Sequence, residues 1–226
     1  MLMNFSKPKL IMKFRRKDSG RAFSLFELLV VIAVLMLLAA IMLPILTRPR
    51  RTSRVGCTNN LKEVGLAFKM WAGDNGDKYP MQVSVTTDGA MEPATNGIVF
   101  PVFQVMSNEI NNPRVVICPE DTQRTPATDF TAGFSNTNIS YFVGLDADET
   151  RPAMFLAGDR NLTNGTPVRH AILELTTKHV AVWTHEMHIT YGNILLTDGS
   201  VQQVTASNLN FLLQHSGVAT NRLLMP

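Results

Sequence analysis

The stretch FSLFELLVVIAVLMLLAAIMLPIL, residues 23–46, decides the class of this protein. Its 24 residues include a single charged side chain, Glu27. As an α-helix at 1.5 Å per residue, the stretch would be about 36 Å long, which exceeds the roughly 30 Å of a bilayer's hydrocarbon core. The stretch therefore predicts a helix that spans a membrane.

The charge around this stretch is uneven. Residues 1–22 hold seven Lys and Arg against one acid, a net +6 within a whole-chain charge of +3, so the rest of the chain carries −3. Basic residues before a spanning helix keep its N-terminus in the cytoplasm, although four arginines also follow the helix. Because the basic pI belongs to the leader, it is poor support for nucleic-acid binding by the remainder.

Two common explanations of such a segment fit less well. A secretory signal peptide has an apolar core of about 7–15 residues that ends at a small-residue cleavage site, whereas this run is longer and leads into a further helix. A simple uncleaved anchor does not explain Glu27, because a carboxylate in a spanning helix costs about 2.5–3.5 kcal/mol at mid-bilayer and less near the end. We therefore expect Glu27 to have a partner.

The motif Ala22-Phe23-Ser24-Leu25-Phe26-Glu27 resembles the cleavage and methylation site of type IV prepilins, although that family usually has Gly in place of Ala22. The resemblance implies that a prepilin peptidase cuts after Ala22 and methylates the new N-terminus on Phe23. It also implies that Glu27 pairs with the terminal amine of a neighbouring subunit. A buried carboxylate and a buried ammonium group each carry a large desolvation cost alone, and pairing makes that cost tolerable. Pro44 fits as well, since pilin-like helices often carry a proline at this depth.

A second apolar pattern predicts that the helix resumes beyond Pro49. It recurs in steps of three and four residues, as on one face of an amphipathic helix. Its members are Cys57, Leu61, Val64, Phe68 and Trp71. The Gly- and Asp-rich segment 73–77 then ends the helix. Residues 23–73 would form one long helix packed against a sheet.

The rest of the chain predicts a sheet preceded by irregular structure. The middle, 81–135, predicts loops with a short helix near Val102–Ile110 and a strand at Val115–Cys118. Further strands are expected at Ile139–Gly144, Ala153–Leu156, Val180–Ile189, Asn193–Thr197 and Ser200–Thr205. Asp198-Gly199 between the last two is a strong hairpin signal, and a helix at Ser207–His215 closes the chain. The fold class is α+β, pilin-like by resemblance, with one long helix over an antiparallel sheet.

Three short elements resemble a branch of bacterial pseudopilin-like proteins. They are Cys57-x-x-Asn-Leu-Lys with a following Asp-Asn loop, Cys118-Pro-Glu-Asp, and His188-x9-Asp198-Gly199. The Asp-Gly pair has a physical reason, because a tight turn needs a positive φ. The sequence gives no such reason for His188, and we expect it to make a structural hydrogen bond.

Two candidate metal sites follow from acids and histidines in the second half of the chain. The calcium candidates are Asp146, Asp148, Glu149 and Asp159. Major pseudopilins of type II secretion, which the chain resembles, bind calcium in a late loop, but this spacing is not that of an EF-hand and solvated loop acids are the alternative. The zinc candidates are His185, Glu186, His188 and Asp198. They lack the i, i+4 helical spacing of zinc proteases, and on a strand His185 would face away from His188.

Cys57 and Cys118 are the two cysteines of the chain, which permits a disulfide in an exported domain. Separately buried thiols are the alternative. Arginines near Cys57 could lower its thiol pKa, but the sequence has no Gly-x-Ser-x-Gly, phosphate loop or dinucleotide fingerprint. We therefore expect no catalytic role and no required cofactor.

The resemblance implies a structural function and three regions: a cleaved leader 1–22, a membrane and assembly helix 23–46, and an exported domain 47–226. The subunit would lie in the bacterial inner membrane and enter a type II secretion pseudopilus or a type IV pilus-like filament. The implied partners are prepilin peptidase, other pilin subunits, a platform protein, an assembly ATPase and membrane lipid, with no nucleic acid required. One alternative is a minor pilin-like binding module for DNA, polysaccharide or a secreted substrate. Another is a membrane-anchored periplasmic enzyme, which would need a pocket with convergent ionisable groups.

Overall fold

The computed structural model describes residues 24–46 and 49–226. The chain divides into two compact units after Arg48, and each is described by itself. The predicted leader, with the cleavage and methylation residues Ala22 and Phe23, lies outside the described residues.

The described part of the first unit is one helix, α1 (Leu25–Leu46), built almost entirely of Leu, Ile, Val, Met and Ala. None of its segment Leu25–Met42 is buried within the structure, and this segment is long and apolar enough to span a membrane. At the start of α1, Ser24 Oγ accepts a hydrogen bond from the Phe26 N–H (3.3 Å), and Glu27 Oε2 accepts one from the Ser24 N–H (3.1 Å). This reciprocal pair resembles a capping box and satisfies amides at the helix N-terminus.

The second unit begins with α2 (Pro49–Asp74), whose buried face confirms the predicted stripe. All five members are buried: Cys57, Leu61, Val64, Phe68 and Trp71. Leu66 lies off this stripe and is 59% exposed. The side chain of Asn75 donates to the Trp71 carbonyl at 2.8 Å, and this cap closes the helix where the Gly- and Asp-rich segment was expected to end it.

Short helical turns fill the middle of the chain. They are η1 (Pro80–Gln82), η2 (Val85–Thr87), α3 (Met91–Thr95), α4 (Phe100–Val105), α5 (Ser107–Ile110), η3 (Pro113–Val116) and η4 (Asn136–Asn138). The predicted helix Val102–Ile110 is therefore two short helices. The predicted strand Val115–Cys118 is wrong, because Pro113 starts a 3-10 turn and the Asn112 side chain caps it by accepting from the Arg114 N–H.

Six antiparallel strands form the main sheet, in the order β4-β8-β1-β2-β6-β7. Their bounds are β1 Tyr141–Gly144, β2 Phe155–Asp159, β4 Ile172–Thr176, β6 Tyr191–Leu196, β7 Val201–Thr205 and β8 Thr220–Leu224. A separate ribbon pairs β3 (Leu162–Thr163) with β5 (Val182–Trp183), and α6 (Ala206–His215) precedes β8. The predicted strand Val180–Ile189 holds only at β5, because the chain beyond it turns to bring Met187 and His188 into the interior.

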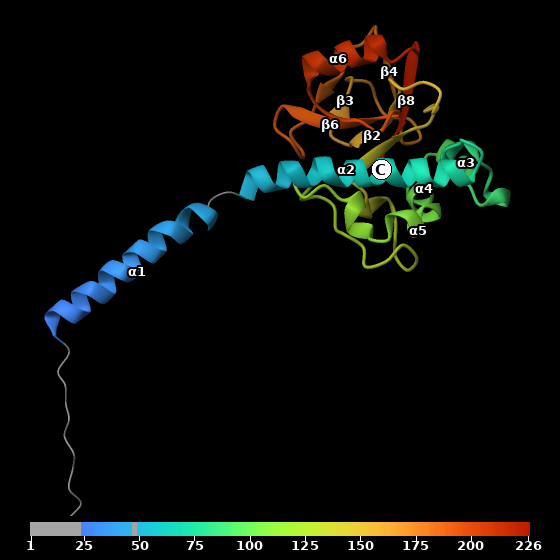
Figure 1. The fold of residues 1–226 in the computed structure, drawn as a ribbon. Helices are drawn as coiled ribbons and strands as arrows, with labels where there is room; N and C mark the ends of the chain where they lie inside the picture. The colour runs from blue at the N-terminus through green and yellow to red at the C-terminus, as the bar shows by residue number, and fades with distance from the viewer. Residues whose placement is uncertain (1–23, 47–48) are drawn as a thin grey trace, which may run out of the picture. The chain divides into compact units, whose positions relative to one another are not determined.

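The main sheet has an apolar core on each face, with α2 on one side and α6 on the other (Figure 1). Tyr141 and Leu195 point toward α2, whereas their strand neighbours Phe142 and Ile194 belong to the core under α6. Gly65 allows α2 to approach the sheet closely, since a Cβ there would lie 2.8 Å from Leu195 Cδ1. The expected α+β class, with an antiparallel sheet and one apolar N-terminal helix, is confirmed.

Candidate functional site

Four side chains of metal-ligand type meet inside the second unit. They are Cys57 from α2, Cys118 from the loop after η3, Asp159 from the end of β2 and His188 from the loop before β6. All four are buried, with exposed fractions of 0% for the first three and 1% for His188. One donor atom of each lies within 4.8 Å of the others. We call these four residues the Cys-Asp-His cluster.

The contacts within the Cys-Asp-His cluster are close. Cys57 Sγ lies 3.2 Å from Asp159 Oδ1, and Cys118 Sγ lies 3.6 Å from His188 Nε2. His188 Nε2 also lies 3.2 Å from Asp159 Oδ2. Two sulfurs, a carboxylate and one imidazole nitrogen are therefore gathered within 4.8 Å of one another.

Other polar groups orient the cluster from outside. Glu120 Oε2 lies 3.0 Å from His188 Nδ1, and because a carboxylate accepts, Nδ1 carries the proton and Nε2 faces the cluster. Asp159 Oδ2 accepts from the backbone N–H and from Nδ2 of Asn193, at 2.7 and 2.8 Å. The ring of Tyr191 stacks on His188 with centroids 4.7 Å apart. The imidazole and the carboxylate are thus both held in one orientation.

An ion-pair clamp lies beside the cluster. Arg160, the residue after Asp159, donates from Nε and Nη2 to Asp121 at 2.8 and 2.9 Å and from Nη1 to Glu186 at 2.7 Å. The Asp121 side chain is fully buried, and that of Arg160 is 9% exposed. These ion pairs connect the end of β2 with the loop that contains Cys118 and with the loop that contains His188.

Burial and neighbouring charges shift the pKa values in the cluster. Burial by itself lowers the pKa of His188, but hydrogen bonds to Asp159 and Cys118 outweigh it and raise that pKa to about 10. The hydrogen bond from Cys57 lowers the pKa of Cys118, whereas burial raises the pKa of Cys57. A protonated His188 would place a positive charge between the carboxylates of Asp159 and Glu120 and would offset part of their negative charge.

Cys118, His188 and Glu120 stand in the thiol–imidazole–carboxylate order that cysteine nucleophiles use. A nucleophile needs a path for its substrate, and Cys118 has an exposed fraction of 0%. Two surface grooves of the described domain are lined by other residues. The arrangement therefore fits the binding of an ion better than covalent catalysis.

The predicted disulfide is not present, since Cys57 and Cys118 are both free thiols. The structure nevertheless brings the two residues into one cluster. Cys57 is directed at Asp159 and Cys118 at His188, so each sulfur has a polar partner other than the second sulfur.

The four acids of the predicted calcium site do not gather. Asp146 forms an ion pair with Arg222 on β8, and Asp148 accepts hydrogen bonds from a threonine in its own loop. Glu149 lies 3.8 Å from a lysine of α2, and Asp159 belongs to the Cys-Asp-His cluster. Each acid has a local partner, so the calcium prediction is corrected.

Of the predicted zinc candidates, His188 alone joins the cluster. His185 is exposed, and Glu186 belongs to the clamp. Asp198 lies in the exposed turn between β6 and β7, where its side chain accepts from the backbone N–H two residues on. Gly199 has a φ of 87°, which confirms the predicted hairpin turn. The sequence signalled His188 by its place in the motif, but it did not indicate its neighbours.

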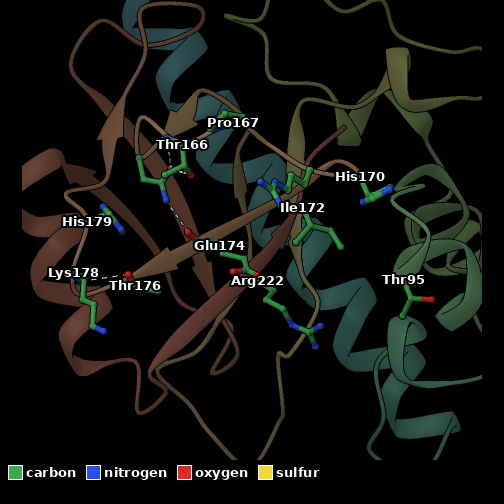
Figure 2. Close-up of a pocket in the computed structure, with 12 residues that line it drawn as sticks. Thr95, Thr166, Pro167, His170, Ile172, Glu174, Thr176, Lys178, His179 and Arg222 are labelled. Atoms are coloured by element: carbon green, nitrogen blue, oxygen red, sulfur yellow. Dashed lines mark hydrogen bonds between the residues drawn. The ribbon is translucent and has the colours of Figure 1, made fainter.

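A polar groove of about 750 Å³ lies along the edge strand β4. Its lining includes Arg169, Glu174, Lys178 and Arg222. Figure 2 shows the labelled side chains spread along β4 and its flanking loops, with Arg222 from β8 and Thr95 from α3 beside them, and without convergence on one point. The groove therefore offers a surface for binding and lacks the convergent ionisable groups that we expected of an enzyme.

Comparisons with protein-family models, with curated proteins and with solved structures gave no match. Two features of the molecule bear on its function. One is the membrane-length helix α1 with its single acid. The other is the buried Cys-Asp-His cluster.

Proposed function

We propose that this protein is a pilin-like filament subunit, which α1 anchors in a membrane and joins to other copies. The observation that carries the proposal is the apolar surface of Leu25–Met42, none of which is buried within the structure. Such a surface requires lipid or other helices around it, because soluble proteins rarely expose large apolar patches. In a filament subunit, α1 would lie in lipid before assembly and against the helices of other subunits afterwards.

Glu27 supports assembly through α1. It is the one charged residue of the helix and lies in its first turn, where the helix dipole favours a carboxylate. Its capping contact uses Oε2, and its side chain is exposed, so an ammonium group of a neighbouring subunit could reach it. The Glu27 carboxylate and the neighbour's ammonium group would compensate each other where both are buried between the two helices and away from water.

The motif at residues 22–27 and the basic leader support the proposed processing. A prepilin peptidase would cut before Phe23 on the cytoplasmic side, and the domain from Pro49 onward would lie in the periplasm. An inner-membrane platform protein and an assembly ATPase would then extract subunits into a type II secretion pseudopilus or a type IV pilus-like filament. The antiparallel sheet packed on α2 is consistent with a pilin-like fold.

The groove along β4 favours one second role, binding of a ligand by a minor subunit. Arg169, Lys178 and Arg222 give the groove cations, and Glu174 gives it an acid. Arg169→Ala with Lys178→Ala would then lower the binding of an anionic polysaccharide or a secreted substrate without changing filament incorporation. Unchanged binding in this double variant would rule out the groove as the ligand site.

The intact mass and N-terminal residue of the membrane-extracted protein test the proposed function. We expect a mature chain that begins at N-methylated Phe23. The control is the same chain produced without prepilin peptidase, which should retain residues 1–22. A stable membrane protein that keeps the leader in the presence of the peptidase would contradict the proposal.

A further inference from the structure

We propose that the Cys-Asp-His cluster is a structural zinc site, in which Cys57, Cys118, Asp159 and His188 bind one Zn²⁺. Each residue supplies a donor that zinc uses in proteins: thiolate sulfur, carboxylate oxygen or imidazole nitrogen. Four such residues with at most 1% exposure are unusual without a cation, because buried charges are normally paired or bound to metal. The inference does not depend on the proposed filament role.

The distances fit tetrahedral coordination. With Zn–S near 2.3 Å and Zn–N or Zn–O near 2.0–2.1 Å, a regular tetrahedron separates its ligand atoms by about 3.3–3.8 Å. Two of these separations are 3.2 Å, from Cys57 Sγ to Asp159 Oδ1, and 3.6 Å, from Cys118 Sγ to His188 Nε2, and all four donor atoms lie within 4.8 Å of one another. Closing the widest separation by about 1 Å or less would therefore bring the four donor atoms to the spacing of a tetrahedral zinc site.

The donor set selects zinc among the common metals. Two sulfurs exclude calcium and magnesium, which take oxygen ligands at higher coordination numbers. The Asp159 carboxylate and the His188 imidazole suit Zn²⁺ better than Cu⁺, which prefers soft sulfur ligands. A tetrahedral set of sulfur with harder donors is typical of zinc.

The groups outside the cluster are those that metal ligands need. Glu120 holds Nδ1 of His188 at 3.0 Å, and a carboxylate on the far nitrogen fixes the tautomer and the ring of a zinc-binding histidine. Asn193 holds Asp159 with two hydrogen bonds. These contacts leave Nε2 of His188 and Oδ1 of Asp159 directed at the sulfurs.

The burial of all four ligands makes this a structural site. A catalytic zinc keeps one position for water or substrate, whereas a structural zinc has four protein ligands. Here the ligands come from α2, from the end of β2 and from two loops, so the ion would join the long helix to the sheet. Since a metal bound only in the folded state adds its binding energy to folding, zinc removal should destabilise the domain.

The metal content of the full chain, extracted in mild detergent and purified without chelator, tests the proposal. Elemental analysis should find about one zinc per chain. Exchange for Co²⁺ should give the visible absorption of tetrahedral cobalt and a thiolate-to-cobalt charge-transfer band. Both measurements use the unmodified protein, so they do not depend on the folding of any variant.

Variants then assign the ligands. Cys118→Ser and His188→Ala should lose most of the zinc and the cobalt spectrum. His185→Ala is the matched control, because His185 lies three residues away and is exposed, and it should keep both signals.

Three results would overturn the proposal. The first is a Cys57–Cys118 disulfide without metal. The second is a pair of reduced thiols that take up no added zinc. In that case a proton on His188 Nε2, and not a metal ion, offsets the buried charge of Asp159. The third is copper or iron in place of zinc at the same stoichiometry.

Discussion

Replacement of Arg160 by methionine tests how the ligand loops are held. Arg160→Met removes the bidentate partner of Asp121, whose side chain is fully buried. Removal of one partner of a buried ion pair costs about 3–5 kcal/mol, because the other charge stays buried and unpaired. For a domain of this size the loss corresponds to a fall in Tm of about 6–20 °C. Methionine retains much of the apolar length of arginine, so lost packing adds little.

The chain offers a matched control in Arg222→Met. Arg222 also contacts Asp146 through two nitrogens, but these side chains are 48% and 33% exposed, and exposed pairs contribute about 0–1 kcal/mol. Urea unfolding in detergent, followed by tryptophan fluorescence, reports on the domain because Trp71 and Trp183 are the two tryptophans of the chain. If Arg160→Met costs no more than Arg222→Met, the clamp is not the buried pair that this reasoning requires.

The same pair predicts how the difference depends on pH. Burial raises the pKa of Asp121, but the hydrogen bonds and charge of Arg160 outweigh it and hold the pKa below its usual value. A carboxylate with a depressed pKa stabilises the folded state above its unfolded pKa of about 3.9, and this contribution is lost as pH falls through the folded pKa. The gap in unfolding free energy between wild type and Arg160→Met should therefore shrink below about pH 4. A gap that widens on acidification would contradict the assignment.

Three further predictions concern other parts of the molecule. Glu27→Leu should leave membrane insertion intact, because it removes a charge from an apolar helix, yet it should lower incorporation into filaments; normal filaments of this variant would argue against pairing with a terminal amine. Leu61→Ala should lower the free energy of unfolding in urea by about 2–5 kcal/mol. Leu66→Ala, at a position 59% exposed, should change that free energy by no more than about 0.5 kcal/mol. Equal losses would mean that the buried face of α2 is misassigned. Glu120→Gln should weaken zinc binding about 10-fold in competition with a chromophoric chelator, and unchanged affinity would show that Glu120 does not orient His188.

Local signals explain which parts of the fold the sequence could predict. The apolar stripe of α2 repeats every three to four residues, and Asp198-Gly199 encodes its own turn, so both predictions are confirmed. β8 is different, because Thr220–Leu224 contains Thr, Asn and Arg and has no strong strand pattern. It is a strand because β1 and β4 pair with it on either side, and such partners far along the chain leave no local trace.

The sequence points to each of the four residues, but in separate hypotheses. It suggests a disulfide or separately buried thiols for Cys57 and Cys118, and a calcium site for Asp159. For His188 it suggests a hydrogen bond or a place in a zinc set with other residues. Spacing could not join them, because the contacts link positions 70 and 102 residues apart and no short ligand motif connects them. Asp159 belongs with the cysteines and not with the loop acids because it is buried at the end of β2, and burial is a property of the folded domain.

The position of Cys57 connects the proposed zinc site with the proposed filament. Cys57 is the first buried residue of α2 among the side chains that the structure describes. A filament subunit held through α1 would transmit load along the chain into α2, and a pull from that end acts first on the contacts nearest to it. A buried apolar side chain there contributes about 1.5–3 kcal/mol, whereas structural zinc contributes about 10–16 kcal/mol in small zinc domains. A metal bond at Cys57 would therefore reinforce the joint between helix and sheet at the place where detachment would begin.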